Sequence, residues 1–151
     1  MNQSNPVIEE DDEMLKILAD SAVDFCQRNL EVTRLRELRE RKDSFDSGKW
    51  SQICELGWAG LVVPEELGGA GLGAVALDKV CRQMGRVVAP EPLLESGIGS
   101  VGVLSKIPGA ADLLGDVMKG KHLIGTALTE PEEFADVRGS EKFGGQTQSD
   151  C

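Results

Sequence analysis

Two groups of residues in this 151-residue sequence have the types and spacing to suggest chemistry. The segment Gly69-Ala-Gly-Leu-Gly-Ala74 fits the loose GxGxxG/A pattern that holds a dinucleotide pyrophosphate at the start of a helix. A dinucleotide-binding fold needs a strand directly before the first glycine and a second strand after the helix. Here Pro64 to Leu67 intervene, and the following helix runs into Ala89-Pro90-Glu91-Pro92. We therefore interpret the glycines as a turn that reverses the chain before the helix.

The second group consists of isolated polar side chains. The single histidine, His122, has no Ser, Cys or carboxylate neighbour at a spacing that suggests a triad. The carboxylates Glu65-Glu66 and Glu132-Glu133 are adjacent in sequence, whereas an acid/base pair must face one substrate across a cleft. We interpret all of these side chains as solvated. Residue types and spacing alone therefore predict no active site in this chain.

Cysteine usage and charge limit the classes of partner. Four cysteines (Cys26, Cys54, Cys81 and Cys151) lie far apart without a CxxC pair, which favours buried thiols over a disulfide framework or a metal site. The chain has 26 acidic and 16 basic side chains and a net charge of -10, a poor match for nucleic acid or anionic lipid. No apolar run approaches the roughly 20 residues of a membrane span. The polar, acidic start (Met1 to Glu13) does not resemble a signal peptide, so we expect a cytoplasmic protein.

The elements that position these residues are predicted to be helices. Apolar residues recur every three or four positions, as on one face of a helix, in four stretches at about 10–26, 47–56, 74–88 and 110–119. A further helix is predicted to start at Pro92, with Leu94, Ile98 and Val101 facing inward. Asp46 or Ser47 can cap the second stretch, and Gly57 can end it in a left-handed conformation.

Three stretches give weaker signals. Residues 31–49 alternate basic and acidic side chains, which favours a solvated helix or loop with local ion pairs over a phosphate-binding patch. Leu61 to Pro64 is predicted to be extended, because proline disfavours a helical residue before it. Three glycines (Gly97, Gly99 and Gly102) within the helix from Pro92 imply either close helix packing or a broken helix.

The end of the chain differs from the rest. His122 to Leu128 is short and apolar and is predicted to be a strand, whereas residues 132–151 have few apolar anchors and are predicted to be disordered. A single strand cannot satisfy its own edge. We therefore expect a mostly α fold: a helical-bundle domain over residues 1–121, the truncated start of a β domain over 122–131, and a disordered tail over 132–151.

One segment is more specific than these patterns. Gly57-Trp-Ala-Gly-Leu-Val-Val-Pro-Glu-Glu-Leu-Gly-Gly-Ala-Gly-Leu72 resembles the GW-x-GL-x-x-PEE-x-GG-x-GL signature of the acyl-CoA dehydrogenase family. A helix ending in Gly85-Arg-Val-Val-Ala-Pro90 follows, as in that family, and Gly125-Thr-Ala-Leu-Thr-Glu-Pro131 resembles the ALTEP element that opens its middle β domain. The resemblance covers roughly residues 10–131.

The resemblance implies an FAD-dependent oxidoreductase that removes hydrogens from Cα and Cβ of an acyl-CoA thioester. Such enzymes pass electrons to an electron-transfer flavoprotein and assemble as oligomers from an N-terminal helical domain, a middle β domain and a C-terminal bundle. The flavin-contacting segment of the family falls here on Thr126, Leu128 and Thr129. Taken without the family, Thr129 could equally end a strand before Pro131.

Two features depart from the family. Residues 132–140 do not match its glycine-serine-aspartate turn, and this chain contains neither the rest of the β domain nor the bundle that carries the catalytic base. We therefore expect no catalytic residue and no metal site within these residues, and we expect the chain alone to be colourless as purified, without bound FAD, and inactive. The alternative is a non-catalytic helical interaction or assembly module that binds no flavin.

Overall fold

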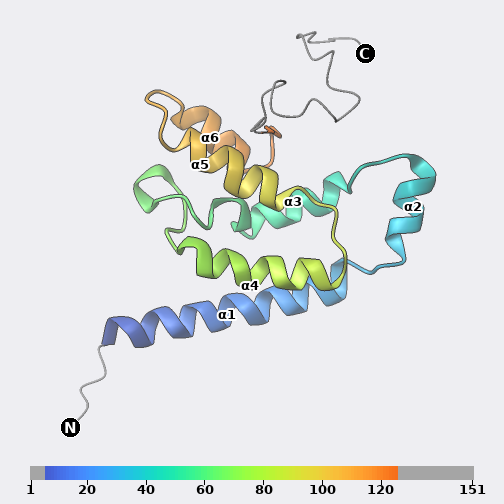
Figure 1. The fold of residues 1–151 in the computed structure, drawn as a ribbon, viewed down its shortest axis with the longest axis horizontal. Coiled ribbons are helices and arrows are strands. Elements are labelled where there is room, and N and C mark those ends of the chain that lie inside the picture. The colour runs from blue at the N-terminus through green and yellow to red at the C-terminus, as the bar shows by residue number, and fades with distance from the viewer. Residues whose placement is uncertain (1–5, 126–151) are drawn as a thin grey trace, which may run out of the picture.

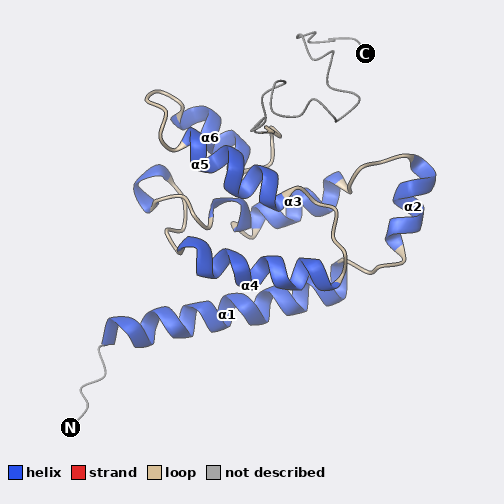
Figure 2. Cartoon of the chain, in the orientation of Figure 1, coloured by secondary structure: helices blue, strands red, loops and turns tan. Residues whose placement is uncertain are grey.

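The computed structural model describes the backbone of residues 6–125 and the side chains from Glu13 to Gly125 except that of Ile98. All regular structure in this part of the chain is helical, which confirms the predicted fold class (Figures 1 and 2). The elements in order are α1 (Pro6–Asn29), α2 (Arg34–Arg41), α3 (Ser47–Glu55), η1 (Trp58–Gly60), η2 (Glu65–Leu67), α4 (Gly73–Arg86), η3 (Glu95–Ser100), α5 (Val101–Leu104) and α6 (Ala111–Met118).

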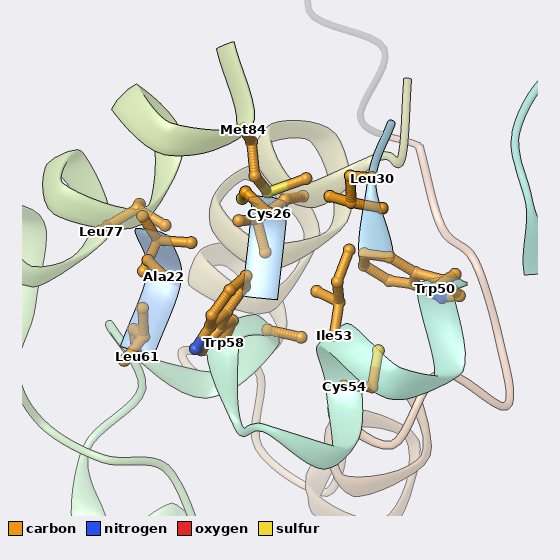
Figure 3. Packing of buried hydrophobic residues seen from close by; sticks show 13 residues of the cluster. Ala22, Cys26, Leu30, Trp50, Ile53, Cys54, Trp58, Leu61, Leu77 and Met84 are labelled. Carbon is orange, nitrogen blue, oxygen red and sulfur yellow. The ribbon is translucent and has the colours of Figure 1, made fainter. Parts of the chain in front are cut away.

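The main core lies where α1 and α4 run side by side beneath α3 and η1 (Figures 1 and 3). Ala22 of α1 lies beside Leu77 of α4, and one turn further along Cys26 lies beside Met84 (Figure 3). Trp58 of η1 is 1% exposed and meets the ring of Phe25 edge-on at a centroid distance of 5.2 Å. Burying such large side chains from one face of each helix is what holds the helices together.

Helix α3 begins and ends as its sequence predicts. The Asp46 carboxylate accepts hydrogen bonds from the backbone N–H groups of Gly48 and Lys49 at 2.9 and 3.0 Å, which satisfies two otherwise free donors. Gly57 follows the helix with a φ of 77°, the left-handed conformation that favours glycine. These contacts are local, which is why the sequence alone indicates them.

Helix α2 stands to one side of the other helices (Figure 1). It buries the side chain of Leu38 and makes a buried ion pair with the chain that follows α4. The Arg34 guanidinium donates to both carboxylate oxygens of Glu91, Nη1 to Oε1 at 2.7 Å and Nη2 to Oε2 at 2.8 Å. The Glu91 side chain is fully buried and that of Arg34 is 13% exposed. The predicted solvated stretch is therefore correct for most of its side chains and wrong for Arg34, which pairs with a residue 57 positions away.

The chain from Leu93 to Leu104 is helical but widens into the π-helical segment η3. A Cβ added to Gly97 would lie 2.9 Å from Leu93 Cδ1 and 3.4 Å from Ala59 Cα, so this glycine permits the close packing that the sequence suggested. The prediction for Leu94 is wrong: it is 55% exposed, and Leu93 is buried in its place. A π turn contains more residues than an α turn, and it therefore shifts which positions face the core.

Two extended segments were also predicted wrongly within the described residues. Residues 61–63 form a turn after η1, in which Leu61 has helical angles and the Val63 N–H donates to the Gly60 carbonyl. Proline restricts only the residue directly before it, here Val63, and leaves Leu61 free to turn. Residues 122–125 carry no strand, whereas residues 126–128 of the predicted strand and the predicted tail at 132–151 lie outside the described residues.

Candidate functional site

The glycine loop uses its backbone N–H groups within the protein. Ala70 N donates to Gly60 O at 3.0 Å, Gly71 N to Val63 O at 2.9 Å, and the amides of Leu72 and Gly73 both donate to the carbonyl of Leu61. A phosphate-binding loop must instead point such groups at its ligand. The structure therefore confirms that the GxGxxG match is a turn and not a dinucleotide site.

Gly69 is the point of closest approach in this loop. A Cβ built on it would lie 2.1 Å from the Val63 carbonyl oxygen and 2.4 Å from Val63 Cβ, distances that no side chain can adopt without backbone movement. Gly71 and Gly73 have φ values of 64° and 71°, in the left-handed region. The loop is thus locked onto the turn at residues 60–64 by its own backbone.

The other polar candidates offer no catalytic arrangement. His122, Glu65 and Glu66 are exposed, as expected for solvated side chains. Desolvation by burial, with the Glu91 carboxylate nearby, raises the pKa of the Cys26 thiol to about 11, and burial together with Glu55 raises the pKa of Cys54 to about 11 as well. Thiols that stay protonated at neutral pH are poor nucleophiles. The described cysteines are free, and no group of His, Cys, Asp and Glu in that part of the chain could hold a metal ion.

A second, smaller core cluster lies where the chain leaves α6. It joins one residue of the turn, one of α5 and two of α6, namely Val63, Val101, Leu114 and Val117, and all are at most 1% exposed. Ile124 packs against this cluster, and its carbonyl accepts a hydrogen bond from the Ser100 hydroxyl. The chain that leads to residue 126 is therefore attached to the helical domain at Ile124.

The predicted flavin-contacting residues come directly after Ile124 and Gly125 in the sequence. Thr126, Leu128 and Thr129 lie outside the described residues, so their proposed role stays a prediction. The chemistry of these residues fits the cofactor, because hydroxyl and amide groups can hydrogen-bond the polar edge of an isoalloxazine ring. The structure adds Ser100, which sequence analysis missed. The only signal for it was a serine within a helix of apolar and glycine residues.

An apolar pocket of about 300 Å³ lies beside the second cluster. Leu104 and Leu114 belong to both the pocket wall and the cluster, and the loop between α5 and α6 closes one side. Leu67 and Ile107 on the rim are 38% and 49% exposed. The lining contains the ionisable side chain of Lys106 but no carboxylate. Such a surface can bind an alkyl or ring substituent.

The helices, with the glycine loop at residues 69–73 bonded to the turn at residues 60–64, form a domain that can be compared with known proteins. A family model described as "Acyl-CoA dehydrogenase, N-terminal domain" matches residues 12–106. The chain belongs to the acyl-CoA dehydrogenase family. The resemblance drawn from the GW…PEE…GG signature and the helical fold expected from it are both confirmed.

The chain is similar to two curated mycobacterial proteins, each named acyl-CoA dehydrogenase IpdE2. It is 29% identical to the protein from Mycolicibacterium smegmatis and 27% identical to that from Mycobacterium tuberculosis, over 128 residues in each case. These alignments cover 81% of this chain and 40% of each relative. The chain therefore spans about 40% of the length of the curated relatives that it matches.

A solved structure has the same fold. The chain matches a variant of the Tcur3481-Tcur3483 steroid acyl-CoA dehydrogenase with a TM-score of 0.68 and 30% sequence identity. The match covers 76% of this chain and 32% of that one. No helix among the described residues is long and apolar enough to cross a bilayer.

Proposed function

We propose that this chain forms the N-terminal helical domain of an FAD-dependent acyl-CoA dehydrogenase, an enzyme that introduces a double bond between Cα and Cβ of an acyl-CoA thioester. The match of residues 12–106 to the family's N-terminal domain carries this proposal. The fold supports it, because the glycine-locked turn and the core of α1, α3 and α4 form the domain as the family resemblance implies.

The residues of this chain would have binding and shielding roles. Thr126, Leu128 and Thr129 would hold the flavin edge through hydroxyl and backbone groups. Bound FAD supplies the acceptor for the hydride that leaves Cβ. The apolar pocket at Leu104 and Leu114 would wall one side of the acyl group and exclude water from it. The proton from Cα would be removed by a carboxylate outside these residues, since none of the described carboxylates lines this pocket.

The wider biology belongs to the same proposal. The complete enzyme would act in the cytoplasm as an oligomer, bind acyl-CoA, and pass electrons to an electron-transfer flavoprotein. The similar solved structure is a steroid acyl-CoA dehydrogenase, so we propose a steroid-bearing acyl-CoA as the first substrate to test. The apolar lining of the pocket is compatible with a hydrocarbon ring.

We also propose that the 151 residues alone neither retain FAD nor turn over substrate, because they correspond to 40% of each relative. The test is to purify the chain, record its absorbance for flavin, and assay reduction of a dye acceptor with steroid and straight-chain acyl-CoA. We expect a colourless, inactive protein. A stoichiometric yellow flavin or acyl-CoA-dependent dye reduction would contradict this part of the proposal.

The family activity itself needs a separate measurement. The intact mass of the protein from its own cells shows whether the chain there exceeds 16.2 kDa. If it does, that longer protein should contain FAD, which the acyl-CoA substrate bleaches on reduction. A longer protein without flavin, or with flavin that no acyl-CoA reduces, would refute the proposed activity.

A further inference from the structure

Ser100 is a buried polar residue at the end of the π-helical segment η3. Its side chain is enclosed, with the residue 2% exposed, and its hydroxyl lies near two carbonyl oxygens, those of Glu95 and Ile124. In a π-helix the carbonyl of one residue accepts a hydrogen bond from the backbone N–H five residues later. The Glu95 carbonyl, five residues before Ser100, therefore already has a backbone donor in this segment. A hydroxyl has one proton to donate. The Ile124 carbonyl is therefore the acceptor that depends on Ser100.

The Ile124 end of this contact has few other attachments. Among the described residues, no backbone N–H donates to the Ile124 carbonyl, and residues 122–125 form no regular structure. The side chain of Ile124 packs against the small cluster that includes Val101, the residue after Ser100. Ile124 is thus held both by a hydrogen bond and by an apolar contact, and the two come from the adjacent residues Ser100 and Val101.

Ile124 precedes Thr126 by two residues and Thr129 by five. Two residues of extended chain span only about 7 Å, so a fixed Ile124 restricts where Thr126 can lie. We infer that Ser100 is a positioning residue, which holds Ile124 and so fixes the point on the helical domain from which the chain continues toward the predicted flavin-contacting segment. This inference rests on the proposed function for its link to flavin, but the attachment itself does not.

The attachment can be tested in the 151-residue chain by NMR of isoleucine δ1 methyl groups. The sequence has six isoleucines, so the signals of Ile124 and of fully buried Ile53 can be assigned separately. In Ser100→Ala we expect the Ile124 methyl to move toward its random-coil shift and to gain mobility on the ps–ns timescale. The Ile53 methyl should stay in place, which shows that the main core is intact.

Two further variants make the test specific. Ser100→Thr keeps the hydroxyl and should restore the Ile124 signal. Ser105→Ala is the matched control, because within residues 6–125 the Ser105 hydroxyl donates only to the Gly102 carbonyl, at 3.0 Å and three residues earlier. It should leave Ile124 unchanged. An Ile124 methyl that is equally ordered in Ser100→Ala and in the unmodified chain would overturn the inference.

The link to flavin is measured in the complete enzyme proposed above. There we expect Ser100→Ala to weaken FAD binding by about tenfold, a loss of the size of one buried hydrogen bond. Ser100→Thr should recover the affinity and Ser105→Ala should not change it. If the unmodified complete protein binds no FAD, the proposed function fails while the NMR result still decides the attachment. If FAD binding is equal in all variants, Ser100 does not position the flavin segment.

Discussion

The sharpest prediction concerns Gly69, where the smallest possible change should have a large cost. In Gly69→Ala the new methyl group would lie 2.1 Å from the Val63 carbonyl oxygen and 2.6 Å from its carbonyl carbon. Both are backbone atoms, so no side-chain rotation can relieve the overlap. The loop would have to move away from the turn, and it would break its hydrogen bonds there.

The magnitude follows from two contributions. Forcing extra volume into a packed site costs about 1–3 kcal/mol. The bonds from Gly71 N to Val63 O and from Ala70 N to Gly60 O would weaken or break, at about 1 kcal/mol each. We therefore expect Gly69→Ala to lower the free energy of unfolding by about 3–5 kcal/mol. Domains of this size have about 5–15 kcal/mol in total, so the variant should lose a substantial part of its stability.

Two other glycines provide matched controls for the same substitution. Gly73 has a φ of 71° but nothing within 4 Å of its added Cβ, so Gly73→Ala should cost only the left-handed strain of about 1–2 kcal/mol. Gly85 lies exposed in α4 with ordinary angles and open space, and Gly85→Ala should stabilise the protein by up to about 1 kcal/mol.

The assay is urea unfolding of the four proteins followed by far-UV circular dichroism, with the free energy taken by linear extrapolation. The expected order of stability is Gly85→Ala, unmodified chain, Gly73→Ala, Gly69→Ala. A Gly69→Ala protein within about 0.5 kcal/mol of the unmodified chain, the range of an ordinary surface change, would refute the reasoning.

Three further predictions use the same measurement. Arg34→Met leaves the buried Glu91 carboxylate unpaired and should lower the free energy of unfolding by about 3–5 kcal/mol. Adding Glu91→Leu should recover most of that loss. Equal stability of the single and double variants would contradict this prediction. The raised pKa of Cys26 means that the unfolded chain loses this proton near pH 9.0 and the folded chain near 11, so stability should fall across that interval, less steeply in Cys26→Ala. An unchanged slope would contradict this. Val88 has a φ of 52° at the end of α4, so Val88→Gly should add about 1 kcal/mol, and any loss would count against left-handed strain there.

The Val88 conformation also explains how α4 stops without a glycine at its end. The Ala89 N–H donates to the Met84 carbonyl at 3.0 Å, and the Val88 N–H donates to the Gly85 carbonyl at 3.2 Å. This pair of bonds is the Schellman arrangement, which needs a left-handed residue at the position of Val88. Hydrogen bonding therefore holds a β-branched residue in a conformation that it disfavours.

Local features of the sequence were enough to predict most of the helices. The single-sided apolar stripes predicted α1, α3, α4 and α6, and Asp46 and Gly57 marked the two ends of α3. Each of these signals acts between residues a few positions apart. Periodicity and capping chemistry therefore contain the necessary information.

Contacts between distant residues could not be predicted in the same way. Arg34 lies in a stretch with several nearby carboxylates, and Arg41–Asp43 is indeed a local exposed pair. Nothing in that alternation indicates that Arg34 alone reaches Glu91. Likewise, Leu93 is buried where the apolar pattern predicted Leu94, and this shift depends on the π turn. A Cβ at Gly97 in this turn would meet Leu93 and Ala59, and periodicity alone does not describe such close packing.

Most residues of the segment that identifies the family differ from the residues proposed to do its chemistry; Leu67, on the pocket rim, is the position that they share. Within the GW…PEE…GG segment, Trp58 fills the core, Gly57 ends a helix, and Gly69 admits the Val63 backbone. The two glutamates are exposed and do not line the pocket. A sequence can therefore retain this segment because the fold requires it, whether or not the chain binds flavin. It follows that substitutions in the segment should change stability, whereas flavin affinity should respond to Thr126, Thr129 and the attachment at Ser100. Only the second kind of variant can test the proposed activity.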